Sequence, residues 1–265
     1  MEIAIYVGII IFGLFSGSIF NRIGNILSNK KDYTYHICNN CNHKIRYLHI
    51  STFSYIFNLA RCKYCKRRIS IFPTFVEIST AALFLIVYLK FSVNDPIWLN
   101  LLYALLFISS LIIIIVSDVE YMLIPDKILI VFGILLAIIK LLFGYYNEEY
   151  KNLLDVGYSI IFLLYDGLFM FFIMYLIKLF GDFLLKKDSM GGGDIKLMFY
   201  ISMILGWKLS IIVVFLAAFL ALPFSIINML RKDQAMLAFG PYLAIASIIL
   251  FLTNVDFNTI ISYII

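Results

Sequence analysis

Long apolar runs alternate with short polar segments along this chain. The apolar runs cover approximately residues 3–21, 74–91, 98–117, 128–146, 153–180, 196–207, 210–230 and 236–253. A helix needs about 20 mainly apolar residues to cross the hydrocarbon core of a bilayer. The pattern therefore predicts an all-α polytopic membrane protein with about eight transmembrane helices. We do not expect the first run to be a removable signal peptide, because no basic leader precedes it and no small-residue cleavage pattern follows it.

One sizeable polar segment, residues 23–73, interrupts this pattern. It divides the chain into a first transmembrane helix at residues 1–22, a cytoplasmic loop at residues 23–73 and a transmembrane core at residues 74–265. The composition agrees with this organisation, since 63% of the residues are hydrophobic and 14% are charged. Such a balance excludes an ordinary soluble globular domain.

Basic residues are distributed unevenly between the segments that join the spans. Most of the 21 Lys and Arg residues follow the first, third, fifth and seventh spans, and the exceptions are Lys90, Lys140, Lys151 and Lys208. Because loops rich in Lys and Arg stay in the cytoplasm, we expect both termini outside the membrane and every basic loop in the cytoplasm. This bias accounts for the net charge of +5. It indicates anionic lipid headgroups as partners and gives no support to nucleic-acid binding.

All four cysteines lie in the polar segment, as Cys38-Asn39-Asn40-Cys41 and Cys62-Lys63-Tyr64-Cys65. Two CxxC pairs at this spacing are typical of a zinc ribbon, in which four thiolates surround one Zn²⁺ ion. A redox dithiol and two disulfides are the alternatives. A reducing cytosol disfavours disulfides, and neither pair lies in a thioredoxin-like βαβ pattern. We therefore predict a structural zinc site formed by Cys38, Cys41, Cys62 and Cys65.

Two aspartates lie where polar loops meet apolar helices at the expected cytoplasmic face. Asp118 follows the apolar run of residues 111–117, and Asp194 follows the glycines Gly191 to Gly193. An acidic side chain at membrane depth is costly and is commonly functional, and glycines let a substrate backbone approach the carboxylate. We therefore predict that Asp118 and Asp194 form a catalytic pair supported by Gly191 and Gly193. The structural alternative is that Asp194 only caps the next helix.

Three other acidic residues also lie in or beside the apolar runs. Glu77 lies about one turn inside the second span, and we predict that it supports the catalytic pair. Asp126 follows Pro125 at the start of the fourth span, where a negative charge stabilises a helix N-terminus, so we rank it below Asp118 and expect a supporting role. Asp166 lies in the middle of the fifth span and no motif explains it.

A pair of carboxyl groups suggests a specific reaction. Two such groups at close range cannot both ionise easily, so they share one proton; the ionised member activates water and the protonated member donates to a carbonyl oxygen. This is the chemistry of aspartic proteases. Neither an HExxH nor a GxSxG motif provides competing hydrolytic machinery.

Taken in order, these motifs resemble the bacterial type IV prepilin leader peptidases. The resemblance covers nearly the whole chain and is carried by Gly17-Ser18 with Asn21, the two CxxC pairs, Pro73-x-x-x-Glu77, Asp118 with Ile124-Pro125-Asp126, Gly191-x-Gly193-Asp194-Ile195-Lys196-Leu197, and Phe239-Gly240-Pro241. It implies an endopeptidase of the bacterial cytoplasmic (inner) membrane that removes short basic leaders from prepilins and pseudopilins at the cytoplasmic face. It also implies that Asp118 and Asp194 are the catalytic aspartates.

Many members of this family also methylate the new N-terminus with S-adenosylmethionine, an activity linked to the cysteine-bearing loop. The resemblance therefore implies a bifunctional enzyme. Residues 49–55 lack the proline usual after the first cysteine pair. No Gly-rich βαβ fingerprint identifies a residue that binds the cofactor. Two alternatives remain: a presenilin-like intramembrane protease with another substrate, and a non-enzymatic secretion-system scaffold that uses the loop for docking.

Overall fold

The computed structural model describes residues 2–28, 36–37, 41, 44–45, 64–65, 71–93, 96–150, 152–186, 190–230 and 238–253. The chain divides into two compact units, Met1–Tyr121 and Met122–Ile265. Unit 1 contains α1, α3 and α4 with a short hairpin, and unit 2 contains α5 to α9.

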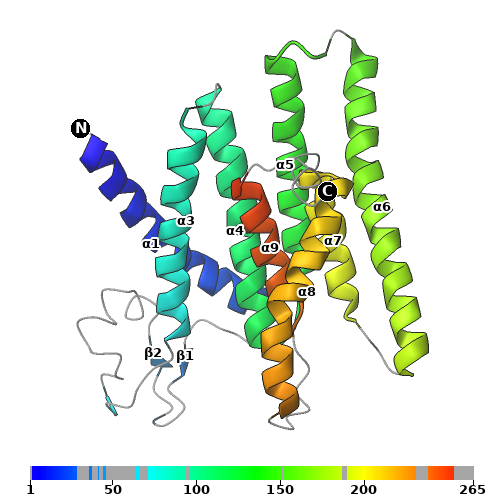
Figure 1. Ribbon diagram of the computed structural model, residues 1–265. Coiled ribbons are helices and arrows are strands. Elements are labelled where there is room, and N and C mark those ends of the chain that lie inside the picture. Colours follow the sequence, from blue (N-terminus) through cyan, green and yellow to red (C-terminus); the bar gives the residue numbers. More distant parts are fainter. Residues whose placement is uncertain are drawn as a thin grey trace. The chain divides into compact units, whose positions relative to one another are not determined.

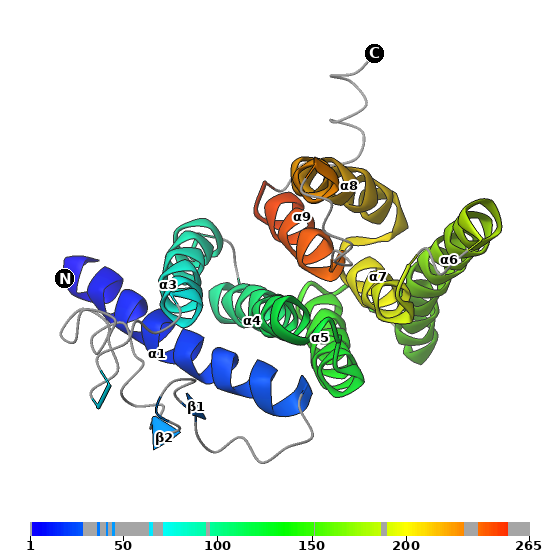
Figure 2. The ribbon, with the colours of Figure 1, turned by 90° about the horizontal axis from the view of Figure 1, so that it is seen from below.

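Unit 1 is built around the long first helix. Helix α1 (Glu2–Ser28) packs against α3 (Phe72–Phe91) and α4 (Ile97–Tyr121), and Figure 2 shows it crossing both. Two glycines allow the close crossing with α3. A Cβ atom on Gly13 would lie 2.6 Å from the Ala81 Cα atom, and one on Gly17 would lie 2.8 Å from the Glu77 Cα atom. Small residues therefore set the distance between the two helices, as is common in membrane bundles.

A small β-hairpin belongs to the polar segment of unit 1. Strands β1 (His36–Ile37) and β2 (Lys44–Ile45) pair antiparallel, with His36 opposite Ile45 and Ile37 opposite Lys44. The connection between the strands, residues 38–43, contains the first CxxC pair. Of this motif, Cys41 belongs to the described residues.

The described residues of unit 2 form five helices. They are α5 (Asp126–Tyr146), α6 (Leu153–Leu185), α7 (Gly192–Leu205), α8 (Trp207–Leu230) and α9 (Gly240–Thr253). Helix α7 packs mainly against α6 and α5, while α8 packs against α9. Figure 1 shows that α8 turns back beside α7 after their junction at Gly206. The extended conformation of Pro125 begins α5, as the sequence predicts.

Each of the eight predicted apolar runs overlaps one helix of the described residues. In chain order these helices are α1 and α3 to α9. Six of these helices are long and apolar enough to cross a membrane, whereas α7 and α9 have 14 residues each. At about 1.5 Å per residue, a 14-residue helix is about 21 Å long and shorter than a hydrocarbon core of about 30 Å. The all-helical membrane architecture is confirmed, but a count of eight crossings is not.

Candidate active site

The two predicted catalytic aspartates lie at opposite kinds of helix end, one in each unit. Asp118 lies in the last turn of α4 and is 5% exposed, and Asp194 lies in the first turn of α7 and is 8% exposed. Both carboxylates are therefore buried within the protein rather than lying on its surface. Their meeting as a pair stays a prediction.

The C-terminal end of α1 packs on the C-terminal end of α4 and carries polar side chains. The Ser28 and Ser117 hydroxyl groups hydrogen-bond to each other, and a Cβ atom on Gly24 would lie 2.9 Å from the Val116 Cγ1 atom. Between these two contacts lies Asn25, which is fully buried and whose Nδ2 group donates to the Asn21 Oδ1 atom at 3.5 Å. The polar end of α1 is therefore packed against the turn of α4 that carries Asp118.

Glu77 belongs to the same buried region of unit 1. It is 2% exposed and lies on α3, where the Gly17 backbone of α1 packs directly against its Cα atom. Thr74 precedes it by one turn and is also buried. Among the described residues, the Thr74 Oγ1 and Asn25 Oδ1 atoms have no hydrogen-bond partner. Since buried polar atoms are nearly always paired, this polar cluster of α1, α3 and α4 has unused hydrogen-bonding capacity.

Sequence reasoning missed Asn25 and Thr74. Asn25 follows Asn21 by four residues, a spacing that places both amides on one helix face, so the pattern contained a usable signal. Thr74 precedes Glu77 by three residues and lies on the same face for the same reason. The predicted supporting position of Glu77 is compatible with this arrangement, because its helix packs on the same α1 surface as α4.

The glycine loop begins the helix that carries Asp194. Gly191 is the N-cap of α7 in an extended conformation, and the Asp194 N–H group donates to its carbonyl oxygen at 3.2 Å. A Cβ atom on Gly191 would lie 3.6 Å from the Asp194 Oδ2 atom, and one on Gly193 would lie 3.3 Å from the Ile124 Cβ atom. The glycines therefore keep bulk away from the carboxylate and let α7 start against the segment before α5. The N-terminal amides of α7 favour a negative charge on Asp194.

Asp126 contacts the helix of Asp194. Both of its carboxylate oxygens accept hydrogen bonds from the Lys196 Nζ atom, at 2.9 and 2.8 Å, and the two side chains are about half exposed. Lys196 follows Asp194 by two residues on α7. Asp126 is the first residue of α5, so its predicted helix-start position is confirmed. Through the ion pair with Lys196, the same residue also connects α5 to the first turns of α7.

An apolar pocket of about 370 Å³ lies beside this ion pair. It is lined by residues of α5, α6 and α7, among them Ile130, Leu164 and Phe199, and the Asp126–Lys196 pair lies at its edge. Its wall is almost entirely apolar, so it suits a hydrocarbon chain or an apolar side chain rather than a polar ligand.

Half of the predicted zinc ligands can be located. Cys41 and Cys65 each lie in a turn, while Cys38 and Cys62 lie outside the described residues. The described part of the chain contains no group of three or more His, Cys, Asp or Glu residues that could hold a metal ion. Thiolates of CxxC pairs are typical ligands of zinc, and the predicted metal stays a prediction.

Comparisons with known proteins agree with one another. Residues 105–226 match the model of the type IV leader peptidase family, and residues 11–91 match the model of the bacterial peptidase A24 N-terminal domain. A prepilin leader peptidase/N-methyltransferase of Bacillus subtilis (strain 168) is 31% identical over 218 residues, which cover 81% of this chain and 78% of the relative. One of Dichelobacter nodosus is 32% identical over 231 residues, which cover 85% and 73%. No solved structure matches the chain.

Proposed function

The chain belongs to the type IV leader peptidase family, and from this we propose that it is a membrane aspartic endopeptidase that removes leader peptides from type IV prepilins and pseudopilins. The observation that carries the proposal is the burial of two aspartates, Asp118 and Asp194, at helix ends within the region that matches the family. The family relationship favours this reaction over a presenilin-like protease with another substrate and over a non-enzymatic scaffold.

The catalytic step is the attack of water on the peptide bond after the leader. Asp118 and Asp194 together hold one proton; the ionised carboxylate removes a proton from water while the other donates its proton to the scissile carbonyl oxygen. Collapse of the resulting tetrahedral species breaks the C–N bond, and the leaving amine takes up a proton. No covalent enzyme intermediate is formed.

The two helix ends support different roles for the two aspartates. The amides at the start of α7 stabilise a negative charge on Asp194, whereas the carbonyl groups at the end of α4 disfavour one on Asp118. We therefore assign the ionised, water-activating role to Asp194 and the proton-donating role to Asp118. Gly191 and Gly193 keep the approach to Asp194 open, while Asp126 and Glu77 support the helices that carry the pair.

The substrate is a prepilin with a short basic leader, and the enzyme lies in the bacterial cytoplasmic (inner) membrane with both termini outside. This topology follows from the basic loops. In it, the C-terminal end of α4 and the N-terminal end of α7 lie at the cytoplasmic face. It requires α7 and α9 to cross as well as the six long helices. Both contain several fully buried residues, so the surrounding helices can shield their ends from lipid.

The second activity is methylation of the new N-terminus, as the names of the relatives indicate for those proteins. S-adenosylmethionine supplies the methyl group, and no residue is assigned to its binding. We propose that Cys38, Cys41, Cys62 and Cys65 hold one structural Zn²⁺ ion that stabilises the cytoplasmic loop. Metal analysis of the purified protein should give about one zinc per chain, and the zinc should be lost in the double variant Cys38→Ser/Cys62→Ser.

The test of the proposed function is mass spectrometry of a prepilin cleaved in liposomes. The wild-type protein should release the leader and, with S-adenosylmethionine, add a methyl group to the new N-terminus. Asp118→Asn and Asp194→Asn should each lower the cleavage rate at least about 10³-fold, because a proton-transfer group is lost from each. Asp155→Asn, which changes a capping residue at the start of α6, is the control and should retain cleavage. Cleavage by either catalytic variant at the wild-type rate would reject the assignment.

A further inference from the structure

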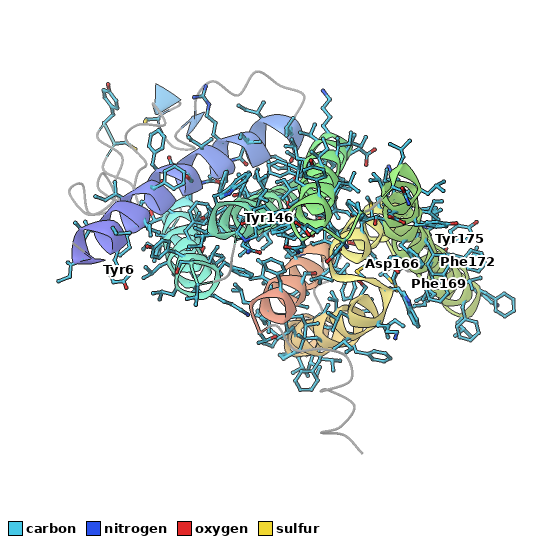
Figure 3. All side chains as sticks on the ribbon, turned by 90° about the horizontal axis from the view of Figure 1, so that it is seen from above. Tyr6, Tyr146, Asp166, Phe169, Phe172 and Tyr175 are labelled. Atoms are coloured by element: carbon cyan, nitrogen blue, oxygen red, sulfur yellow. The ribbon has the colours of Figure 1, made fainter. Side chains whose placement is uncertain are left out.

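Asp166 is an acidic residue in the middle of α6 that the peptidase reaction does not explain. Its carboxylate lies near the backbone N–H group of Trp207, the first residue of α8. A Cβ atom on Gly206 would lie 3.7 Å from its Oδ2 atom. Figure 3 shows Asp166 on the side of α6 next to α7. The carboxylate therefore faces the start of α8, at the junction where α7 ends.

Lys140 reaches the same junction from α5. Its Nζ atom donates a hydrogen bond to the carbonyl oxygen of Met203, in the last turn of α7, at 3.4 Å. Its positive charge also interacts with the carboxylate of Asp166. One cation and one anion from two different helices thus meet at the point where the chain passes from α7 to α8.

Each charge faces the helix end that it stabilises. The last carbonyl groups of α7 lack partners within the helix and form the negative end of its dipole, which a cation stabilises. The first N–H groups of α8 form a positive end, which an anion stabilises. Lys140 donates to the former, and the Asp166 carboxylate lies beside Gly206, which directly precedes the latter. The two charges therefore stabilise the C-terminal end of α7 and the N-terminal end of α8. These ends are separated by Gly206 alone, which has a positive φ of 83°.

The end of α7 is also packed tightly on α6. The Ser202 Oγ atom donates to the backbone carbonyl oxygen of Asp166 at 2.8 Å. A Cβ atom on Gly167 would lie 2.8 Å from the Phe199 Cε2 atom, so glycine at this position lets the Phe199 ring approach α6 closely. The position of α7 along α6 is therefore fixed at its C-terminal end by contacts that one residue of sliding would break.

We propose that Lys140 and Asp166 are positioning residues that set the depth of α7, and through it the position of the Asp194 carboxylate. Asp194 lies 12 residues before Gly206, about 18 Å along a straight helix. The proposal rests on the catalytic role of Asp194 proposed above. Because α7, with 14 residues, is shorter than the hydrocarbon core that it crosses in the proposed topology, the contacts at its far end determine where its first turn lies.

Two independent measurements test this proposal. The first is the kcat and KM of prepilin cleavage in liposomes by Lys140→Met and Asp166→Asn. The second does not depend on activity: it is the rate at which a membrane-impermeant maleimide labels Gly192→Cys, followed by mass spectrometry of the peptide that contains residue 192. Lys208→Met, which removes a cation one residue after Trp207, and Asp155→Asn, which removes an acid from α6, are the matched controls.

Loss of either charge should lower kcat by roughly 3- to 30-fold, within the range of a charge at a helix terminus, while KM changes less than twofold. The labelling rate at residue 192 should change in the same variants and not in the controls. Lys140→Arg and Asp166→Glu should largely retain the wild-type values. The exchange variant Lys140→Asp/Asp166→Lys should not retain the wild-type values, because it keeps one positive and one negative charge but places each charge against the helix end that it destabilises.

Recovery of wild-type kcat by the exchange variant would overturn the proposal, since the mutual attraction of the two charges would then be sufficient. An unchanged labelling rate in both single variants would overturn it as well. If the wild-type protein cleaves no prepilin, the proposed function fails, and the labelling rates alone decide whether the pair positions α7.

Discussion

The ends of α4 and α7 hold their aspartates by different means. Asp118 lies in the last turn of a 25-residue helix, beside the buried Ser117 and in the region where the polar end of α1 packs on α4. Asp194 lies in the first turn of a 14-residue helix in unit 2, beside glycines and backbone amides, and this helix is joined to α5 by the Asp126–Lys196 ion pair. The position of Asp118 depends mainly on packing, and that of Asp194 mainly on electrostatics. Variants in unit 1 should therefore change the melting temperature or kcat, whereas the ion pair in unit 2 should give a salt-dependent change in kcat/KM.

The largest effect should come from filling the contact between α1 and α3. Gly17→Leu forces a side chain into the Glu77 backbone, 2.8 Å from the position of the new Cβ atom, and should destabilise unit 1 by about 1–3 kcal/mol. Thermal unfolding in detergent should show a lower melting temperature together with reduced peptidase activity. Gly8→Leu on the same helix is the matched control, because a Cβ atom on Gly8 would meet no atom of another helix within 4 Å. Equal melting temperatures for the two variants would contradict the packing account.

An effect within the same range of free energy, but on kcat, is expected at Asn25. Asn25→Leu removes a fully buried amide beside the end of α4 and leaves Asn21 without its hydrogen-bond donor. Such a loss costs about 1–3 kcal/mol, and we expect about a tenfold decrease in kcat with little change in KM. Asn100→Leu, at the opposite end of α4, should leave kcat unchanged. A change in KM alone would show that Asn25 acts on substrate binding and not on the catalytic aspartate.

The smallest effect should come from the ion pair between Asp126 and Lys196. Because both side chains are about half exposed, solvent screens their attraction and the pair should contribute roughly 0.2–1 kcal/mol. A double-mutant cycle with Asp126→Asn and Lys196→Met, read as kcat/KM, should therefore give a coupling of at most about fivefold that decreases at high salt. A coupling of 100-fold that does not depend on salt would mean that the pair takes part in the reaction itself.

The sequence predicted the helices well, because long apolar runs leave few other structures in a membrane. The start of α5 follows from Pro125-Asp126, and the apolar run from residue 153 predicts the start of α6, which the structure caps with Asn152 and Asp155. The glycines before Asp194 also predicted the start of α7. Local pattern was sufficient in each of these cases.

Other features could not be predicted, because they depend on contacts between distant segments. The length of α7 is set by Gly206, which looks like part of a short loop in the sequence, and the roles of Lys140 and Asp166 depend on the position of that break. The partner of Asp126 lies 70 residues away on α7. Hydropathy alone also made α7 and α9 look like complete spans, although each has only 14 residues.

The central claim is that Asp118 and Asp194 lie close enough to share a proton, and cross-linking tests it most directly. Asp118→Cys/Asp194→Cys would be treated in liposomes with a short bifunctional thiol reagent, and the cross-link would be detected as a linked peptide pair by mass spectrometry. Ser28→Cys/Ser117→Cys is the positive control, because these two hydroxyl groups hydrogen-bond to each other. A bifunctional reagent is used because two carboxyl groups that share a proton hold their Cβ atoms farther apart than the about 3.5–4.5 Å that a disulfide requires. The account predicts that both pairs link; linkage of the control pair without linkage between residues 118 and 194 would contradict it.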